Sequence, residues 1–321
     1  MLTVQQQSIP VPLPGGDVLQ LQRFTGTAAG PPVLMLHGAI ENGRIFYSES
    51  GKGMAPYLAR NGYDVYVIDL RGHGKSLPAI DRSSCFGQTE AICEDIPACI
   101  EAVRKLRGPI PQQWIAHSWG GVFFSSVLAR FPEYSKDVAS LVYFGSKRTI
   151  RVWNIQRIVK VELVWKWICP LACLIYGYLP ARQLRIGSDS ETAKFYRQSA
   201  EWVKNHVWVD SDDGFDYGAA VKKLSLPPIW YLAAENDRAL GHPDDVRDFM
   251  ESSGRQECRY TLLACKNGNL HDYDHIDMLT HSDAVQDHFP LVLEWLRQHA
   301  TESDQKNRSE SCRKSIPPRL N

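Results

Sequence analysis

The sequence lacks a surplus of charge of either sign. Its 321 residues include 36 lysines and arginines and 36 aspartates and glutamates, so the formal net charge is zero. A protein dedicated to binding nucleic acid would carry a basic surplus or a basic face. We therefore expect no nucleic-acid partner.

An apolar leader segment and paired cysteines are also missing. Residues 1–14 are polar, with three glutamines in a row, whereas a secretory signal needs a positively charged stretch followed by an apolar one. The eight cysteines are scattered, without the paired spacing of a zinc site or of a compact disulfide framework. These absences predict a cytoplasmic protein with reduced thiols and no metal site.

No clean run of about 18 apolar residues, the length that a membrane-spanning helix needs, occurs in the sequence. The most apolar stretch, residues 152–179, is interrupted by Lys160, Glu162 and Lys166, and we expect Pro170 to break its helix. A repeat of fixed period is also absent. The length fits one enzyme-sized domain with room for an insertion.

Strand and helix signals alternate along most of the chain. Short continuous apolar runs, typical of strands buried on both faces, lie at 33–36, 64–70, 138–144 and 227–234. Helical spacing appears between them, at 53–61 and 91–106. The alternating stretch 17–24 fits an antiparallel edge region. The order predicts an α/β protein with a doubly wound, mostly parallel sheet and helices on both faces.

The stretch around Ser118 is the strongest local signal. An apolar strand ends at Ala116, and a helical pattern starts just after Gly120. So tight a turn forces a strained backbone on Ser118 and needs very small residues two positions before and after it. The first helical turn would place free N–H groups beside the serine hydroxyl. Taken alone, the stretch also fits an ordinary βα turn.

Several motifs, in their order along the chain, resemble the α/β-hydrolase fold superfamily. They are His37-Gly38, the loop Asp69 to Ser76, the Ala116 to Gly120 turn, an acid after a late strand and a histidine near the end. Alanine stands at 116 where the commonest pattern has glycine. The motifs are most similar to those of the esterase, monoacylglycerol lipase and acid-lipase branches, and the resemblance covers most of 32–299.

The resemblance implies a catalytic triad in the order serine, acid, histidine. Ser118 matches the nucleophile. Asp237 best matches the acid, with Glu235 as the fallback, because the preceding strand runs into 145–148, which offers no carboxylate. His275 matches the histidine, with His271 as the competitor, since the sequence around 275 is similar to the acid-lipase pattern.

These residue types suit nucleophilic catalysis at a carbonyl. A serine hydroxyl is a poor nucleophile, so a neutral imidazole must take its proton and return it to the leaving group. A buried carboxylate orients the imidazole and stabilises its charged form. By resemblance, the backbone N–H groups of Ala39 and Trp119 stabilise the oxyanion that forms on the substrate.

The resemblance also predicts the organisation of the chain. We expect a hydrolase core at 1–148 and 226–299, a helical cap or lid at 149–225, and a disordered tail at 300–321. The first half of the cap is strongly apolar. Two interpretations of it remain open: a lid packed on the rim of the core, or a lid whose apolar face meets acyl chains or a membrane surface.

We predict a serine hydrolase that cleaves carboxylic esters of lipophilic acyl groups, without a cofactor or a metal. The partner would be a small-molecule ester substrate, and the sequence assigns no oligomeric state. The same fold also hosts aminopeptidases, carbon–carbon bond hydrolases, acyltransferases and non-catalytic ligand binders. An aminopeptidase would need cap carboxylates for the substrate ammonium. The candidates for that role are Glu191, Asp210, Asp212 and Asp213.

Overall fold

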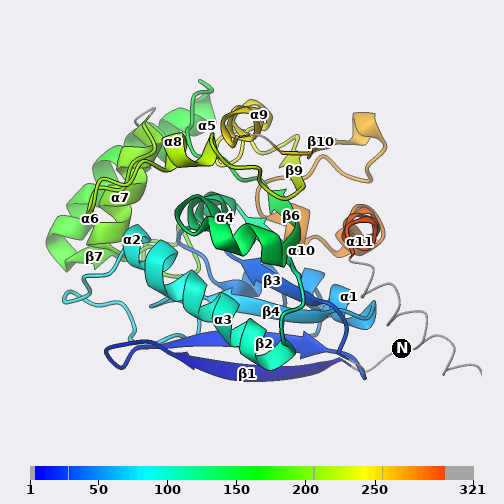
Figure 1. The fold of residues 1–321 in the computed structure, drawn as a ribbon. Helices are drawn as coiled ribbons and strands as arrows, with labels where there is room; N and C mark the ends of the chain where they lie inside the picture. The colour runs from blue at the N-terminus through cyan, green and yellow to red at the C-terminus, as the bar shows by residue number, and fades with distance from the viewer. Residues whose placement is uncertain (1–3, 28, 205–206, 255, 301–321) are drawn as a thin grey trace, which may run out of the picture.

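A computed structural model of the chain describes residues 4–27, 29–204, 207–254 and 256–300, with only the backbone at 157, 160 and 161. The tail predicted at 300–321 therefore lies outside the described residues, apart from its first residue. Figure 1 shows a central sheet with helices on both of its faces.

The sheet has eight strands in the order β1-β2-β4-β3-β5-β6-β9-β10. Their bounds are β1 Gln5–Pro12, β2 Val18–Thr25, β3 Pro32–Leu36, β4 Asp64–Asp69, β5 Gln112–His117, β6 Val138–Phe144, β9 Ile229–Ala234 and β10 Cys258–Leu263. The strands β1, β2 and β4 pair antiparallel, and all other pairs are parallel. The mostly parallel sheet predicted from the sequence is confirmed.

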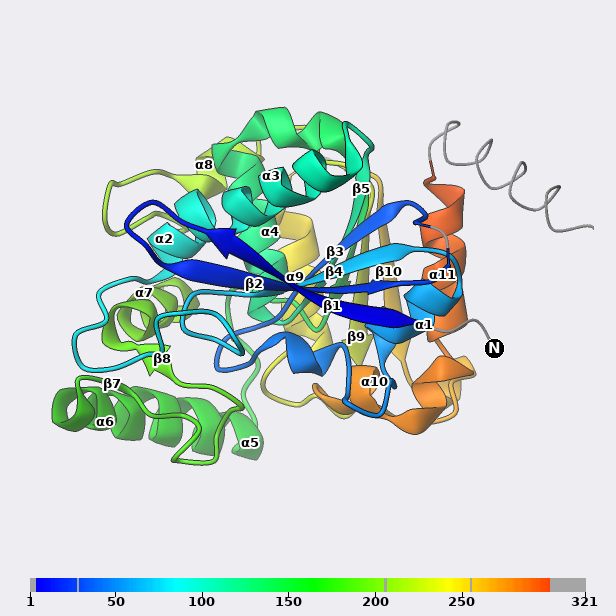
Figure 2. The same ribbon diagram turned by 90° about the horizontal axis from the view of Figure 1, so that it is seen from below.

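Helices pack on both faces of this sheet (Figures 1 and 2). One face carries α1 (Met54–Arg60) and α11 (Phe289–Gln298), and the other carries α3 (Ile96–Arg107), α4 (Trp119–Arg130) and α9 (Pro243–Ser252). The strands β3, β4 and β5 are buried along their whole length; the apolar run of β3 predicts this, whereas β5 also buries the polar Gln112, Gln113 and His117. The parallel strands end at one edge, where β3, β5, β6 and β9 lead into the loops that form the candidate site.

Shorter helical segments connect these elements. They are η1 Gly43–Ile45, α2 Gln88–Glu90, η2 Ala91–Asp95, η3 Pro132–Asp137, η5 Cys265–Asn267, α10 Asp277–Thr280 and η6 Ser282–Val285. The helix expected at 91–106 is thus divided, because it begins as the π-helical η2 before α3. The strand β1 was not predicted, since its side chains are mostly polar and exposed at the edge of the sheet.

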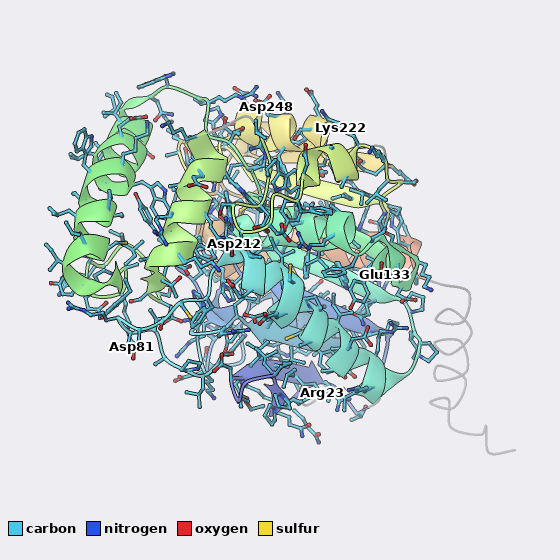
Figure 3. The ribbon with its side chains drawn as sticks, turned by 60° about the vertical axis from the view of Figure 1, so that its left-hand side comes forward. Arg23, Asp81, Glu133, Asp212, Lys222 and Asp248 are labelled. Carbon is cyan, nitrogen blue, oxygen red and sulfur yellow. The ribbon has the colours of Figure 1, made fainter. Side chains whose placement is uncertain are left out.

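Residues 149–225 form a group of helices between β6 and β9, which we call the insertion. Its elements are α5 Ile155–Arg157, η4 Ile158–Ile168, α6 Cys169–Tyr176, β7 Tyr178–Leu179, β8 Glu191–Thr192, α7 Ala193–Lys204 and α8 Tyr217–Val221. Figure 2 shows α5, α6 and α7 beside the core, at the lower left. The insertion contacts the core through an ion pair between Lys194 and Glu90 of α2. Lys194 also pairs with Asp212 of the insertion itself, which Figure 3 labels.

The expectation that Pro170 breaks the apolar helix is wrong. The π-helical η4 ends at Ile168 and α6 begins at Cys169, so helical structure continues past the proline. Pro170 is the second residue of α6, directly after the change from π-helical to α-helical hydrogen bonding. Among the described residues, no helix is long and apolar enough to cross a membrane.

The outer face of the insertion is unusually apolar. Trp153, Ile155, Trp167 and Leu174 are 69%, 80%, 73% and 82% exposed. The inner face is anchored by buried Cys169 and Ala172, which pack near Tyr196 of α7. The apolar residues of this stretch therefore lie on two faces of the insertion, one packed against α7 and one exposed to solvent.

Candidate active site

Ser118 lies at the sharp junction between β5 and α4, in a strained backbone conformation with φ 52° and ψ −120°. Such a conformation is rarely adopted by a residue with a side chain and is often found at functional sites. Gly120 makes the turn possible, because a Cβ there would lie 2.5 Å from the carbonyl oxygen of Leu36. The need for a very small residue at 120, inferred from the sequence, has this physical cause.

His275 and Asp237 are in direct contact. The loop after β9 carries Asp237, and the loop before α10 carries His275, whose Nδ1–H donates to Asp237 Oδ2 at 2.5 Å. Both side chains are buried. This bond fixes the ring orientation and leaves Nε2 as the nitrogen available to a substrate or nucleophile.

The charges in this pair are well defined. Burial opposes ionisation of Asp237, but His275 and the backbone N–H of Gly241 hold the pKa of its carboxyl well below the usual range. Burial also lowers the pKa of His275, and Asp237 only partly offsets this effect. The pair therefore holds a carboxylate beside an imidazole that is neutral near pH 7, which suits a general base.

The two competitors for these roles lie elsewhere. His271 Nε2–H donates to Asp283 Oδ2 at 2.8 Å, and Glu235 pairs with Lys266 at 2.8 Å. All four side chains are partly or largely exposed. Neither His271 nor Glu235 lines the cavity that contains Ser118 and His275.

Ala39 and Trp119, whose backbone N–H groups are the expected oxyanion donors, both line the cavity that contains Ser118. Among the described residues, neither group donates a hydrogen bond within the protein. The Trp119 N–H belongs to the first turn of α4, where N–H groups have no partner within the helix. Two such donors near a serine are the arrangement that stabilises an oxyanion.

The loop after β3 is held in place by the insertion. Ile40 has φ 54°, a genuine outlier for a β-branched residue. Its N–H donates to Glu191 Oε1 at 2.7 Å, and its carbonyl accepts from the N–H of Ser188 at 2.8 Å. The strained conformation of Ile40 is therefore fixed by contacts from a distant segment, with Glu191 lying 151 residues away along the chain.

Glu41 and His117 form a second buried pair, which the sequence analysis did not identify. His117 Nδ1 donates to Glu41 Oε2 at 2.8 Å, and its Nε2 donates to the carbonyl of His275 at 2.8 Å. Because both nitrogens donate, His117 is an imidazolium. Burial acts against both charges, yet each partner stabilises the other: the pKa of His117 is raised and that of Glu41 falls to about 2.

This pair joins two loops of the site. Glu41 Oε2 also accepts from the N–H of Gly38 at 2.9 Å, so the loop after β3 is tied through His117 to the loop that carries His275. A sequence signal did exist. Glu41 lies in the loop after buried β3 and His117 ends buried β5, but their proximity depends on the pairing of β3 with β5.

Potential metal ligands gather at this point, because the nearest donor atoms of Glu41, His117 and His275 lie within 4.8 Å of one another. These donors are engaged in hydrogen bonds: His117 uses both nitrogens, and His275 uses Nδ1 to Asp237. The hydrogen bonds account for the cluster without a metal ion.

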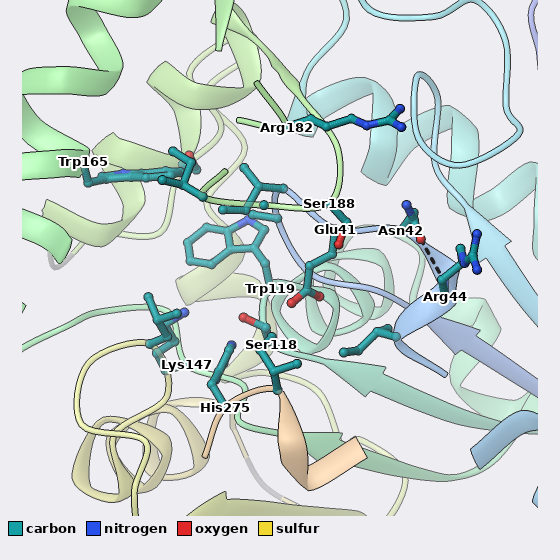
Figure 4. A pocket seen from close by; sticks show the side chains of 18 of the residues that line it. Glu41, Asn42, Arg44, Ser118, Trp119, Lys147, Trp165, Arg182, Ser188 and His275 are labelled. Atoms are coloured by element: carbon teal, nitrogen blue, oxygen red, sulfur yellow. Dashed lines mark hydrogen bonds between the residues drawn. The ribbon is translucent and has the colours of Figure 1, made fainter. Parts of the chain in front are cut away.

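A cavity of about 710 Å³ opens above Ser118 and His275 (Figure 4). Core loops and the insertion both contribute to its wall. Apolar side chains make up much of the lining, among them Ile45, Ile150, Trp165, Ile186, Val203 and Leu240. The dimensions and the lining suit a small organic molecule with an apolar part.

The four carboxylates proposed for an aminopeptidase are occupied elsewhere. Glu191 pairs with His73, Asp210 accepts from Thr89 and Tyr217, Asp212 pairs with Lys194, and Asp213 pairs with Arg130. None of the four lines the cavity. The aminopeptidase interpretation therefore loses its ammonium-binding groups.

Comparisons with known proteins agree with this architecture. A family model described as alpha/beta hydrolase fold matches residues 31–158. Bifunctional epoxide hydrolase 2 of Sus scrofa is 32% identical over 120 residues, which are 37% of this chain and 19% of that protein. The match thus spans about a fifth of the length of this curated relative.

Two solved structures resemble nearly the whole chain. The α/β hydrolase GrgF from Penicillium sp. sh18 has a TM-score of 0.62 at 16% identity and covers 92% of this chain and 99% of its own. An esterase from Exiguobacterium antarcticum has a TM-score of 0.59 at 15% identity and covers 91% and 100%. With the matching family model and the sheet order described above, they show that the chain has the α/β-hydrolase fold.

Proposed function

We propose that the protein is a serine hydrolase that cleaves carboxylic esters of lipophilic acyl groups, with Ser118 as nucleophile, His275 as base and Asp237 as its orienting acid. One observation carries the proposal. A serine in a strained turn shares a cavity with a histidine whose other ring nitrogen is bonded to a buried carboxylate. This arrangement activates a hydroxyl toward a carbonyl.

In the proposed reaction, His275 Nε2 takes the hydroxyl proton while Ser118 Oγ attacks the ester carbonyl. The carbonyl oxygen becomes an oxyanion, and the N–H groups of Ala39 and Trp119 stabilise it. The carbon–oxygen bond to the alcohol then breaks, and His275 gives its proton to the departing oxygen. A water molecule, deprotonated by His275, releases the acid and restores Ser118.

The apolar lining supports an acyl ester as the substrate, with the insertion acting as a lid over the cavity. The insertion contributes Trp165, Ile186 and Val203 to the wall. Closing such a site excludes water and strengthens the interactions of the oxyanion. We expect the cavity to take the acyl chain, because apolar side chains make up much of its lining.

The proposal is tested by measuring the hydrolysis of p-nitrophenyl acetate, hexanoate and dodecanoate by the natural chain and by Ser118→Ala. We expect the kcat/KM value to be highest for one of the two longer esters and turnover to disappear in the variant. Ser126→Ala is the matched control. Ser126 is buried on the same helix, and its hydroxyl donates to the carbonyl of Val122. Equal turnover by natural chain and Ser118→Ala would contradict the proposal.

Epoxide opening is a second candidate function, because the curated relative named above is called a bifunctional epoxide hydrolase. The chemistry of Ser118 argues against it. A hydroxyl that opens an epoxide forms an ether, which water does not readily cleave, whereas an acyl ester on serine is readily hydrolysed. Turnover of styrene oxide that survives in Ser118→Ala would support the second candidate.

The exposed apolar face of the insertion supports the second of the two interpretations left open by the sequence, in which the insertion meets acyl chains or a membrane surface. Trp153 and Trp167 are large, exposed residues of the kind that favour the membrane interface. We expect Trp153→Ser/Trp167→Ser to reduce co-sedimentation with phosphatidylcholine vesicles. The control Leu106→Ser removes an exposed apolar side chain from α3 instead. Equal co-sedimentation of all three proteins would contradict this prediction.

The predicted cytoplasmic location stays a prediction. The seven cysteines described by the structure form no disulfide with one another, which fits reduced thiols. Alkylation of the purified chain under native and denaturing conditions tests whether the thiols are reduced. Seven or more reactive thiols after denaturation without reductant would fit this expectation.

A further inference from the structure

Lys147 is a buried cation in the wall of the candidate active site. It follows β6 by three residues, at the edge of the sheet where Ser118 and Asp237 also lie. Its side chain is only 6% exposed, and it lines the same cavity as Ser118 and His275. Figure 4 shows the Lys147 amine turned toward the interior of this cavity.

The Lys147 ammonium has no ion-pair partner among the described residues. Asp237, Asp245 and Glu41 act on it through space, but each accepts a hydrogen bond from another group, although Asp245 Oδ2 has no partner in the described part of the chain. Asp237 accepts from His275, Glu41 accepts from His117, and Asp245 accepts from the N–H of Arg151 at 2.8 Å. Lys147 Nζ lies 5.8 Å from the centre of the Trp119 ring, which offers a cation–π contact but no negative charge.

Such an arrangement is costly unless a ligand completes it. Burial of an unpaired ammonium is strongly unfavourable, and burial accordingly lowers the pKa of Lys147. The three carboxylates oppose this fall in pKa. A cation held in this way, facing an open cavity, is suited to bind an anion that enters with the substrate.

The position of Lys147 places this anion on the alcohol side of the ester. In the proposed reaction, His275 protonates the departing alcohol, so the alcohol lies beside the His275 ring. Lys147 is close enough to His275 to lower the pKa of its imidazole. The acyl chain would extend toward the apolar wall formed by the insertion.

We propose that Lys147 binds a carboxylate or phosphate group carried by the alcohol part of the ester substrate. This inference rests on the proposed function and narrows its substrate class from neutral esters to esters of anionic alcohols. Arg182 and Arg185 also line the cavity, but they are exposed, so water screens their charge far more than that of buried Lys147. Lys147 is then a specificity residue and takes no part in proton transfer.

The test compares three esters with one acyl group: hexanoyloxyacetate, hexanoyloxymethylphosphonate and the neutral 1-hexanoyloxypropan-2-one. We expect the natural chain to prefer one or both anionic esters, and the better of the two identifies the anion. In Lys147→Met, the kcat/KM value for that ester should fall about 15- to 150-fold, the usual range for a lost charged hydrogen bond, with little change for the neutral ester. Lys147→Arg should restore part of the loss.

Arg182→Met is the matched control, because it removes a cation from the rim and leaves Lys147 in place. We expect it to change the kcat/KM value for the anionic ester less than about threefold. An equal loss for charged and neutral esters in Lys147→Met, or an equal loss in Arg182→Met, would overturn the assignment.

A binding experiment separates this inference from the proposed function. Calorimetric titration of hexanoyloxyacetate into Ser118→Ala measures the binding affinity without turnover. The same titration into Ser118→Ala/Lys147→Met measures how much of this affinity depends on Lys147. Weaker binding in the double variant supports the anion site even if the natural chain hydrolyses none of the esters. Equal binding contradicts it even if ester hydrolysis is found.

Discussion

The buried pair between Glu191 of the insertion and His73 of the core makes a quantitative prediction. His73 Nε2 lies 3.2 Å from Glu191 Oε1, although the angle falls outside hydrogen-bond geometry. Burial acts to lower the pKa of His73, but Glu191, with Asp189 and the carbonyl of Arg71, outweighs it and raises this pKa to about 9. The neighbouring His37 ring is neutral, since burial lowers its pKa to about 3.

The raised pKa sets both the size and the pH range of the effect. A rise from 6.5 to about 9 corresponds to about 3 kcal/mol in the free energy of unfolding. Because the folded-state pKa is the higher one, this contribution is complete below about pH 6.5 and is lost as the pH rises through about 9. If Glu191 is neutralised, the charge of Asp189 still raises the pKa of His73 and so retains part of this stabilisation.

The perturbation is Glu191→Gln, whose amide oxygen can still accept from the N–H of Ile40. We expect the variant to be less stable than the natural chain by about 2 to 3 kcal/mol at pH 6 and by less than about 1 kcal/mol at pH 9. Urea unfolding followed by tryptophan fluorescence measures both values. Glu133→Gln, which neutralises an exposed carboxylate, is the control. A difference that is the same at pH 6 and pH 9 would refute the reasoning.

Three further predictions concern the candidate site. Asp237→Asn should lower kcat for ester hydrolysis about a thousandfold or more, because the amide no longer holds the required His275 tautomer; kinetics that stay within tenfold of the natural chain would contradict this. The acid limb of the pH profile of kcat/KM should have its midpoint below pH 6.5, since burial lowers the pKa of His275; a midpoint above 7 would speak against His275 as the base. Gly120→Ala should destabilise the fold by about 1 to 3 kcal/mol, because the new Cβ meets the carbonyl of Leu36; an unchanged urea midpoint would show that the Ser118 turn tolerates a larger residue.

Local signals in the sequence predicted much of the fold and part of the site. The apolar runs of β3, β4 and β6 identify strands without reference to the rest of the chain. The turn at Ser118 was recognisable because the small residues that it needs lie within two positions of it. The choice of His275 and Asp237 depended on resemblance, since His271 and Glu235 fit equally well by residue type alone.

The remaining features depend on contacts between distant segments. The pairing of Glu41 with His117 spans 76 residues, and the contact of Glu191 with Ile40 spans 151. Local periodicity carries no information about such contacts. The sequence also could not predict that Lys147 lacks an ion-pair partner among the described residues. That property depends on hydrogen bonds that Asp237, Asp245 and Glu41, all distant in the sequence, make to other groups.

Helix continuity at Pro170 shows a different limit. A proline inside an apolar helical stretch predicts a break, because it removes an N–H and crowds the preceding turn. In this chain the change from π-helix to α-helix falls at Cys169, one residue before the proline. The hydrogen-bond pattern of the helix changes at this point, and the helix does not end.

The most direct test of Ser118 as an activated nucleophile is the intact mass of the protein after exposure to an uncharged fluorophosphonate. The natural chain should gain one adduct, Ser118→Ala should gain none, and His275→Ala should react much more slowly. No adduct on the natural chain, or an adduct that persists in Ser118→Ala, would contradict the proposed hydrolase mechanism.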